Sequence, residues 1–155
     1  MWNLANSEGG GMMLIDAVLD ATNITQGGDD APTGGGLYAS GSSTVDLINS
    51  IIAEAATGEG VLVGGSASFT GTYNDVYNNA GGNYSGITDP TGSGGNLSSD
   101  PLFTSWSNDG NSSNDDLTLS SGSPAIDAGD SSSAYDDADG TRNDMGAWGG
   151  PGSGW

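Results

Sequence analysis

The chain contains no cysteine, lysine or histidine, and Arg142 is its only basic residue. Without cysteine it can form neither disulfides nor a zinc–thiolate site. Without histidine it can have neither a histidine general base nor a Ser-His-Asp triad. Its 20 acidic residues give a net charge of −19. Because nucleic acids bind through basic surfaces, this charge excludes DNA and RNA as direct partners.

Long apolar runs are also missing. The sequence has no stretch of 18 apolar residues, so no membrane span is predicted. Of the 155 residues, 34% are hydrophobic and 29 are glycine, which is too little apolar material for a broad two-layer core. One domain with a narrow core along an axis fits better. Residues 1–6 have no signal-peptide pattern, so either a signal has been removed or the chain is a fragment of a longer protein.

What the sequence does contain is a repeat. Leu47–Ile52 is matched by Thr72–Tyr77, and Gly35–Tyr38 is matched by Gly60–Val63 at the same offset. Repeats of this length are typical of stacked units, none of which can bury its apolar face alone. Three short strands and three turns make a coil of this length. We therefore predict an all-β fold, a short parallel β-helix with about 25 residues per coil over residues 12–80.

The repeat also predicts which side chains stack on one another. A weaker copy at Leu14–Leu19 lies more than one coil length before Leu47–Ile52, which indicates a loop insertion at Gly27–Pro32. Stacked asparagine amides can hydrogen-bond along the axis, although asparagine is also a common turn residue. The predicted inward stacks, and a polar ladder between them, join equivalent positions of successive coils: Leu14/Leu47/Thr72, Val18/Ile51/Val76, Leu37/Leu62 and Asp16/Asn49/Asn74.

The two ends of such a helix need covering, because an uncapped coil exposes unpaired backbone groups and an open core. Residues 1–11 are predicted to be a segment that can cap the first coil, and residues 81–155 to be loop-rich final coils with an irregular C-terminal cap. Trp2 and Leu4 are candidate plugs at one end, and Trp148 and Trp155 at the other. An open end predicts other copies of the chain, or further coils, as partners, including end-to-end self-assembly.

Four segments of the C-terminal half occur in an order that resembles a known family. They are Asp100–Phe103 (DPLF), Asp116–Leu119 (DLTL), Ser123–Gly129 (SPAIDAG) and Asp139–Gly149 (DGTRNDMGAWG). This order is similar to the C-terminal end of bacterial right-handed parallel β-helix proteins of the pectin-lyase-like kind, which are secreted or surface-anchored. The resemblance covers about residues 12–151. It implies a right-handed β-helix, an extracellular or cell-surface location, and a chain that corresponds to the last few coils of longer proteins.

The C-terminal region also holds the best metal candidate. In Asp136–Asp144 the carboxylates alternate with other residues around a glycine, like half of a calcium loop. Asp137, Asp139 and Asp144 are the expected calcium ligands, together with the backbone carbonyl near Thr141. The segment lacks the closing glutamate of an EF-hand, and Asx-turns are the alternative explanation.

Arg142 is predicted to have a structural role. One guanidinium among 20 acidic side chains should find a carboxylate, and Asp127 and Asp144 are the expected partners. Such a pair would hold the C-terminal segment in place.

Three classes of function fit these features. The first is a non-enzymatic extracellular module that is structural, adhesive or self-assembling, and stabilised by calcium. The second is a fragment of a polysaccharide-active glycosidase or lyase, although the carboxylates do not recur at equivalent repeat positions and a lyase would have only Arg142 as a base. The third is a carbohydrate-binding module with Tyr38, Tyr73, Tyr77 and Tyr84 as stacking platforms, or as residues that pack under loops.

Overall fold

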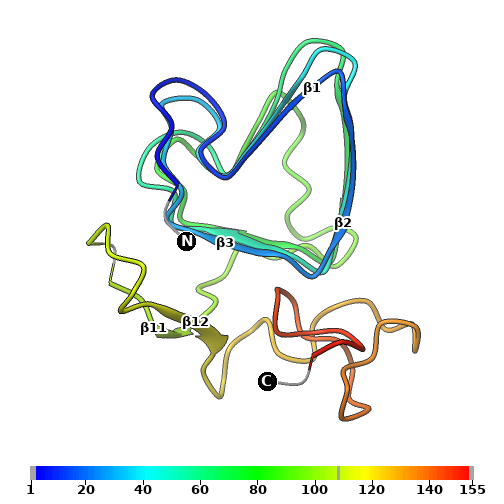
Figure 1. The fold of residues 1–155 in the computed structure, drawn as a ribbon. Coiled ribbons are helices and arrows are strands. Elements are labelled where there is room, and N and C mark those ends of the chain that lie inside the picture. The colour runs from blue at the N-terminus through cyan, green and yellow to red at the C-terminus, as the bar shows by residue number, and fades with distance from the viewer. Residues whose placement is uncertain (1–2, 108, 154–155) are drawn as a thin grey trace.

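The structure, a computed structural model, describes residues 3–107 and 109–153 and contains twelve β-strands and no helix within them. Ten strands form three parallel sheets: each of the first three coils adds one strand to each sheet, and a tenth strand extends one sheet only. The first sheet is β1 (Met12–Ile15), β4 (Leu37–Ser40), β7 (Val61–Val63) and β10 (Tyr84–Ser85); the second is β2 (Val18–Thr22), β5 (Thr44–Ile48) and β8 (Ser68–Thr72); the third is β3 (Thr25–Gly27), β6 (Ile51–Ala53) and β9 (Asp75–Tyr77). The predicted all-β parallel helix is confirmed, and Figure 1 looks along its axis.

The register differs by a single position from the predicted one. Between the second and third coils Leu37 pairs with Val61 and Thr44 with Ser68, so the coil is one position shorter than the sequence repeat indicated. A slip of this size moves every side chain of a strand to the opposite face. Val61 and Val63 are therefore buried inside the coil, and Leu62 is not the inward partner of Leu37.

The other predicted stacks are also wrong, because the longer offset of the upstream copy adds to the one-position slip. Leu14 stacks on Ala39 and Val63 instead of Leu47 and Thr72, and Val18 is 80% exposed on the outer surface. Ile51 faces outward, whereas Ile52 and Val76 stack inside. In the second sheet Val18 pairs with Thr44, and the offset between these two residues is close to one ordinary coil length. The longer offset of the upstream copy, and the large insertion that it implied, are therefore wrong.

Corners of the coils explain the true spacing. At each corner the chain turns through a residue with positive φ, and these residues align from coil to coil as Asp16/Gly41/Gly65, Asn23/Asn49/Tyr73 and Gly28/Glu54/Asn78. Asparagine, aspartate and glycine tolerate this left-handed conformation best. Tyr73 holds the same corner as Asn49, and a tyrosine at this position concealed the register in the sequence.

A polar ladder does run along the interior, but of the three predicted members only Asn74 belongs to it. Asn74 stacks between Ser50 and Asn96: its Oδ1 accepts the Ser50 N–H at 2.9 Å, and its own N–H donates to Asn96 Oδ1 at 3.0 Å. Its Nδ2 donates to the Leu47 carbonyl at 2.7 Å. Asn49 and Asp16 lie at corners and are not members of this ladder.

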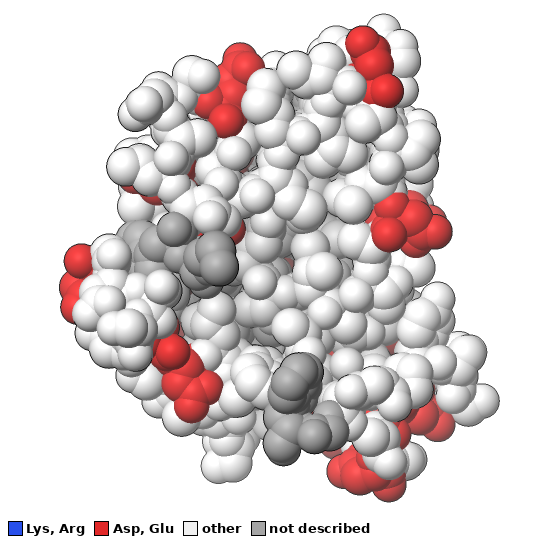
Figure 2. Space-filling model, viewed as in Figure 1, with Lys and Arg blue, Asp and Glu red and all other residues white. Residues whose placement is uncertain are grey.

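The two ends of the coil stack are closed to different degrees. At the far end, β10 pairs with β7, Leu97 bridges to Asp75, and the chain between them crosses the outline of the coils (Figure 1). At the first-coil end, β1, β2 and β3 are the edge strands of their sheets. In Figure 2, which shows the molecule from the same direction as Figure 1, the acidic side chains lie mainly around the rim of the visible face.

Residues 3–11 lie beside a loop of the first coil and do not plug this open end. Residues 3–11 run beside the loop 29–36, where Ala5 N–H donates to the Asp30 carbonyl at 2.8 Å and Gly9 N–H to the Thr33 carbonyl at 3.0 Å. Leu4, a predicted plug, is 77% exposed. Trp2 and Trp155 lie outside the described residues.

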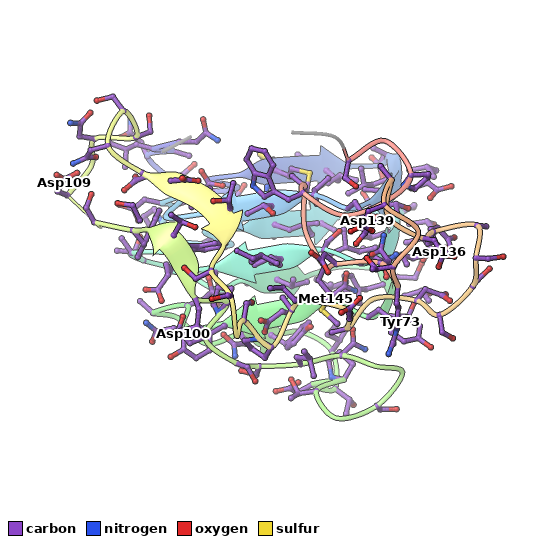
Figure 3. All side chains as sticks on the ribbon, turned by 90° about the horizontal axis from the view of Figure 1, so that it is seen from below. Tyr73, Asp100, Asp109, Asp136, Asp139 and Met145 are labelled. Atoms are coloured by element: carbon purple, nitrogen blue, oxygen red, sulfur yellow. The ribbon has the colours of Figure 1, made fainter. Side chains whose placement is uncertain are left out.

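The C-terminal segment, defined here as residues 101–153, lies along one side of the coils rather than across their end (Figure 1). It begins with an antiparallel hairpin of β11 (Phe103–Ser105) and β12 (Asp116–Leu119) and continues as turns. Figure 3 shows it over the strands of the third sheet, with Met145 near their middle. The predicted irregular C-terminal cap therefore covers a lateral face, and Trp148 does not close an end.

Candidate functional site

The outer face of the third sheet forms a second apolar core with the C-terminal segment. Ile51 and Ala53 point out of the coil, on the opposite side from Ile52, yet they are only 0% and 2% exposed. Ala125 and Met145 pack on them, and Phe103 and Leu119 of the hairpin and Leu97 surround this cluster. Burial of these side chains favours docking of the C-terminal segment on the sheet.

A column of corner residues, Asn23, Asn49 and Tyr73, binds the same segment through hydrogen bonds and a ring contact. Asn23 Nδ2 donates to the carbonyls of Asp144 at 2.9 Å and Gly146 at 3.0 Å. The Asn49 carbonyl accepts the Gly146 N–H at 2.7 Å, and Asn49 Oδ1 accepts the Asp130 N–H at 2.7 Å. Asn49, which was expected in the interior ladder, instead anchors the C-terminal segment.

Arg142 lies over Tyr73, the third residue of this column. Its guanidinium carbon is 5.9 Å from the centre of the Tyr73 ring, within the range of a cation–π contact. Its Nε donates to the Gly129 carbonyl at 2.7 Å and its Nη2 to the Ala128 carbonyl at 3.2 Å. The structure does not show the expected ion pair with Asp127 or Asp144. The guanidinium donates its hydrogen bonds to backbone carbonyls instead.

Replacing Arg142 by alanine should lower the free energy of unfolding by about 1–3 kcal/mol, because it removes the charge-assisted hydrogen bonds to two backbone carbonyls and the contact with Tyr73. Arg142→Lys keeps the charge but not the forked donor geometry, so it should restore only part of the loss. Urea denaturation at neutral pH measures both changes. An unchanged midpoint for Arg142→Ala would contradict this role.

Beside the docked segment lies an open cleft of about 660 Å³. The metal ligands expected from the sequence, Asp137, Asp139, Thr141 and Asp144, all line it. The remaining lining residues are Asp127, Thr118, Ser153, Ile126, Ala138 and Trp148. Carboxylates, hydroxyls and one indole ring therefore share this cleft, and Arg142 is not part of its lining.

The carboxylates of the cleft are held by backbone N–H groups. Asp137 Oδ1 accepts the Gly150 N–H at 2.5 Å, and Asp137 Oδ2 accepts the Asp144 N–H at 3.1 Å. The Asp144 carboxylate accepts the Asp127 N–H at 2.7 Å. Asp139 Oδ1 accepts both the N–H and the hydroxyl of Thr141, an Asx-turn of the kind that was the alternative explanation.

These carboxylates also act on one another electrostatically. Burial raises the pKa of Asp144, and the charges of Asp137, Asp127 and Asp139 raise it further. The pKa of Asp137 is raised by burial, with added repulsion from Asp139 and Asp127. Hydrogen bonds from Thr141 lower the pKa of Asp139 instead. The cleft is thus a region of negative potential that favours a bound cation.

One feature of this site suits calcium and another does not. Its donor set consists of oxygen atoms only, which is the chemistry that calcium prefers. Within residues 3–107 and 109–153, however, no group of three or more acidic side chains is arranged so as to hold one metal ion. Calcium binding here therefore requires carbonyl and hydroxyl oxygens or water to supply part of the coordination shell.

The tyrosines considered for sugar stacking lie in different places. Tyr38 is half-buried on β4 of the first sheet, Tyr73 lies at the corner under Arg142, and Tyr77 packs in the cluster of the third sheet. Tyr84 packs against the inner core of the coils. These four rings do not form one shared stacking surface.

Sequence reasoning did not identify several residues of this region. Asn143 is fully buried, and its Nδ2 donates to the Tyr135 carbonyl at 2.8 Å. Trp148 lines the acidic cleft, although it was expected at an end of the helix. Asp75 is a fully buried carboxylate on β9. In the sequence, Asn143 and Trp148 stand out only as parts of the segment Asp139–Gly149. Nothing in that segment indicates that it docks on the corner column.

Comparison of the chain with family models, with curated proteins and with solved structures gives no match. Among the described residues there is also no helix of the length and apolarity needed to span a membrane.

Proposed function

We propose that this chain is a non-enzymatic structural or adhesive module of the extracellular space or cell surface, in which calcium bound in the acidic cleft stabilises the docked C-terminal segment. The observation that carries the proposal is that four carboxylates, those of Asp127, Asp137, Asp139 and Asp144, line one cleft of that segment. Arg142 and the corner asparagines serve docking, so the polar residues described around the third sheet support the segment rather than a reaction.

Calcium fits this role for a physical reason. The cleft carboxylates repel each other when ionised, and a divalent cation removes that repulsion. Extracellular modules bind calcium with dissociation constants of about 10⁻⁴–10⁻³ M, which needs no complete cage of carboxylates. The extracellular location itself rests on the resemblance to secreted β-helix proteins.

The open first-coil end supports a further part of the proposal, that additional coils or another copy of the chain pair with it. Three edge strands, β1, β2 and β3, lie there. In the described part of the chain, five large hydrophobic residues are exposed; Leu4, Met13, Ile15 and Val18 belong to the first coil, and Leu102 does not. Unpaired strand edges with apolar neighbours favour pairing with other strands.

Calcium should raise the thermal midpoint of the protein at neutral pH, and a chelator should reverse the effect. Magnesium at the same concentration is the control for general charge screening, since it gives up its hydration shell reluctantly. Asp144→Asn removes a cleft charge and keeps the oxygen that accepts the Asp127 N–H, so it should raise the midpoint without calcium and reduce the response to calcium. Asp137→Asn should also reduce the response to calcium, but it replaces an acceptor of the Gly150 or Asp144 N–H and should not raise the midpoint. Equal responses to calcium and magnesium, unchanged by these variants, would contradict a specific site.

A second candidate function, cleavage of a polysaccharide, is favoured by one observation. In one cleft the pKa of Asp139 is lowered while the pKa values of Asp137 and Asp144 are raised, and Trp148 offers a ring on which a sugar can stack. Glycosidases use two carboxyl groups whose surroundings shift their pKa values in opposite directions. Release of reducing ends from acidic and neutral polysaccharides by the native chain, lost in Asp139→Asn, would favour this function over the structural one.

A further inference from the structure

A carboxylate lies buried beneath the point where the chain leaves the coils. Asp75 on β9 has an exposed fraction of 0% and pairs in register with Ile51 of the apolar outer face. Its Oδ1 accepts the Ser99 N–H at 3.0 Å. Its Oδ2 is buried and has no hydrogen-bond partner among the described residues. An unpaired buried carboxylate oxygen is expensive when charged and much less so when it carries a proton.

No basic group among the described residues compensates this carboxylate. The negative charge of Asp100 repels the Asp75 carboxylate and raises its pKa. The charge of Asp75 in turn raises the pKa of the Tyr84 hydroxyl. The facing positions on the neighbouring strand and bridge are the apolar Ile51 and Leu97. Arg142 is engaged at Tyr73 and at two backbone carbonyls. Residues 97–100, which cover Asp75, lead directly into the C-terminal segment.

We propose that Asp75 is a proton-operated switch for docking: when it is protonated, residues 97–105 and the C-terminal segment stay closed on the third sheet, and when it is ionised their docking weakens. This inference is independent of calcium and of the acidic cleft. It would make the lateral cover of the coils tighter in acidic surroundings than in neutral ones.

The direction of the effect follows from linkage. Burial first, and the charge of Asp100 second, raise the pKa of Asp75 to about 6, although the Ser99 N–H opposes this. A carboxyl group has its ordinary pKa once the cover opens and water reaches it. Near pH 4 and below, Asp75 is protonated while docked and adds little cost. As the pH rises to about 6 the opened form releases the proton first, so the docked form loses stability, and above that pH the full loss is present.

Hydrogen exchange measured by mass spectrometry tests the switch in the whole chain. At about pH 7, under conditions where exchange reports the opening equilibrium, Asp75→Asn should slow the exchange of residues 97–105 roughly a hundredfold relative to the native chain. Each unit by which docking raises the pKa of Asp75 changes the docking equilibrium tenfold, and the pKa rises from 3.8 to about 6. At about pH 4 the two proteins should exchange alike. Asp20→Asn removes an exposed charge from β2 and is the matched control, which should behave like the native chain at both pH values.

The proposal is overturned if Asp75→Asn gives no added protection at pH 7, or if protection rises equally in the first coil and in residues 97–105. A second measurement does not depend on any variant folding well. In a carboxyl-carbon NMR titration of the native protein, Asp75 should titrate near pH 6, and a midpoint at the ordinary aspartate pKa would equally overturn the switch.

Discussion

Replacing Asn74 by alanine should lower the free energy of unfolding by about 3–5 kcal/mol, because each buried group left without a partner costs about 1–3 kcal/mol. Asn74 is fully buried, and its amide serves two backbone groups of the second coil, the Ser50 N–H and the Leu47 carbonyl. Both residues are themselves buried, so alanine leaves a donor and an acceptor unpaired inside the protein. The loss should therefore exceed that of an ordinary polar substitution.

Urea denaturation followed by circular dichroism measures this effect. Asn6→Ala, at an exposed asparagine, is the control and should change stability by less than about 0.5 kcal/mol. Asn74→Asp should be as damaging as alanine, because a carboxylate cannot donate to the Leu47 carbonyl and adds a buried charge. If Asn74→Ala matched the control, the interior ladder would be unimportant for stability.

Gly146→Ala should destabilise docking of the C-terminal segment by about 4 kcal/mol, since it combines left-handed strain of about 1–2 kcal/mol with overpacking of about 1–3 kcal/mol. Gly146 has φ of 93°, and a Cβ atom there would lie 2.5 Å from the Thr25 hydroxyl and 2.9 Å from Ile51 Cδ1. Gly146 also exchanges hydrogen bonds with Asn49 and Asn23, so a shift of its backbone would disturb the corner column.

The chain contains a matched control for this prediction. Gly140 has φ of 85°, and a Cβ atom there would meet nothing within 4 Å. Gly140→Ala therefore carries the backbone strain without the collision and should cost only about 1–2 kcal/mol. Hydrogen exchange in residues 123–150, compared with that in the first coil, separates local undocking from global unfolding. Equal effects of the two substitutions would argue against close docking at Gly146.

The parallel coils could be predicted from the sequence, but their register could not. Aligning asparagine with asparagine, Asn49 with Asn74, makes the coil one position too long, because the residue that holds the equivalent corner is Tyr73. The backbone conformation is what repeats, and a tyrosine with positive φ is rare enough to mislead a comparison of side-chain types. Because side chains alternate with period two, this error placed Leu62 and Ile51 among the inward residues although they face outward.

The carboxylates of the cleft were predicted as a group because they are close in sequence, from Asp137 to Asp144. The docking surface was not, since it joins positions far apart in the chain, as in the bond from Asn23 to Asn143 at 3.2 Å. The partner of Arg142 was missed for a related reason: charge counting favours a carboxylate, whereas the guanidinium is held by carbonyls and by the Tyr73 ring. No local pattern in the sequence indicates such a choice.

Calorimetric titration of the native chain with calcium, alongside the double variant Asp137→Asn/Asp144→Asn, tests the central claim most directly. The cleft predicts saturable binding at neutral pH with a dissociation constant of about 10⁻⁴–10⁻³ M. The double variant should lose this binding, because both substituted carboxylates line the cleft. Absence of saturable binding, or the same binding in the variant, would show that the acidic cleft is not a calcium site and would contradict the proposed calcium-stabilised module.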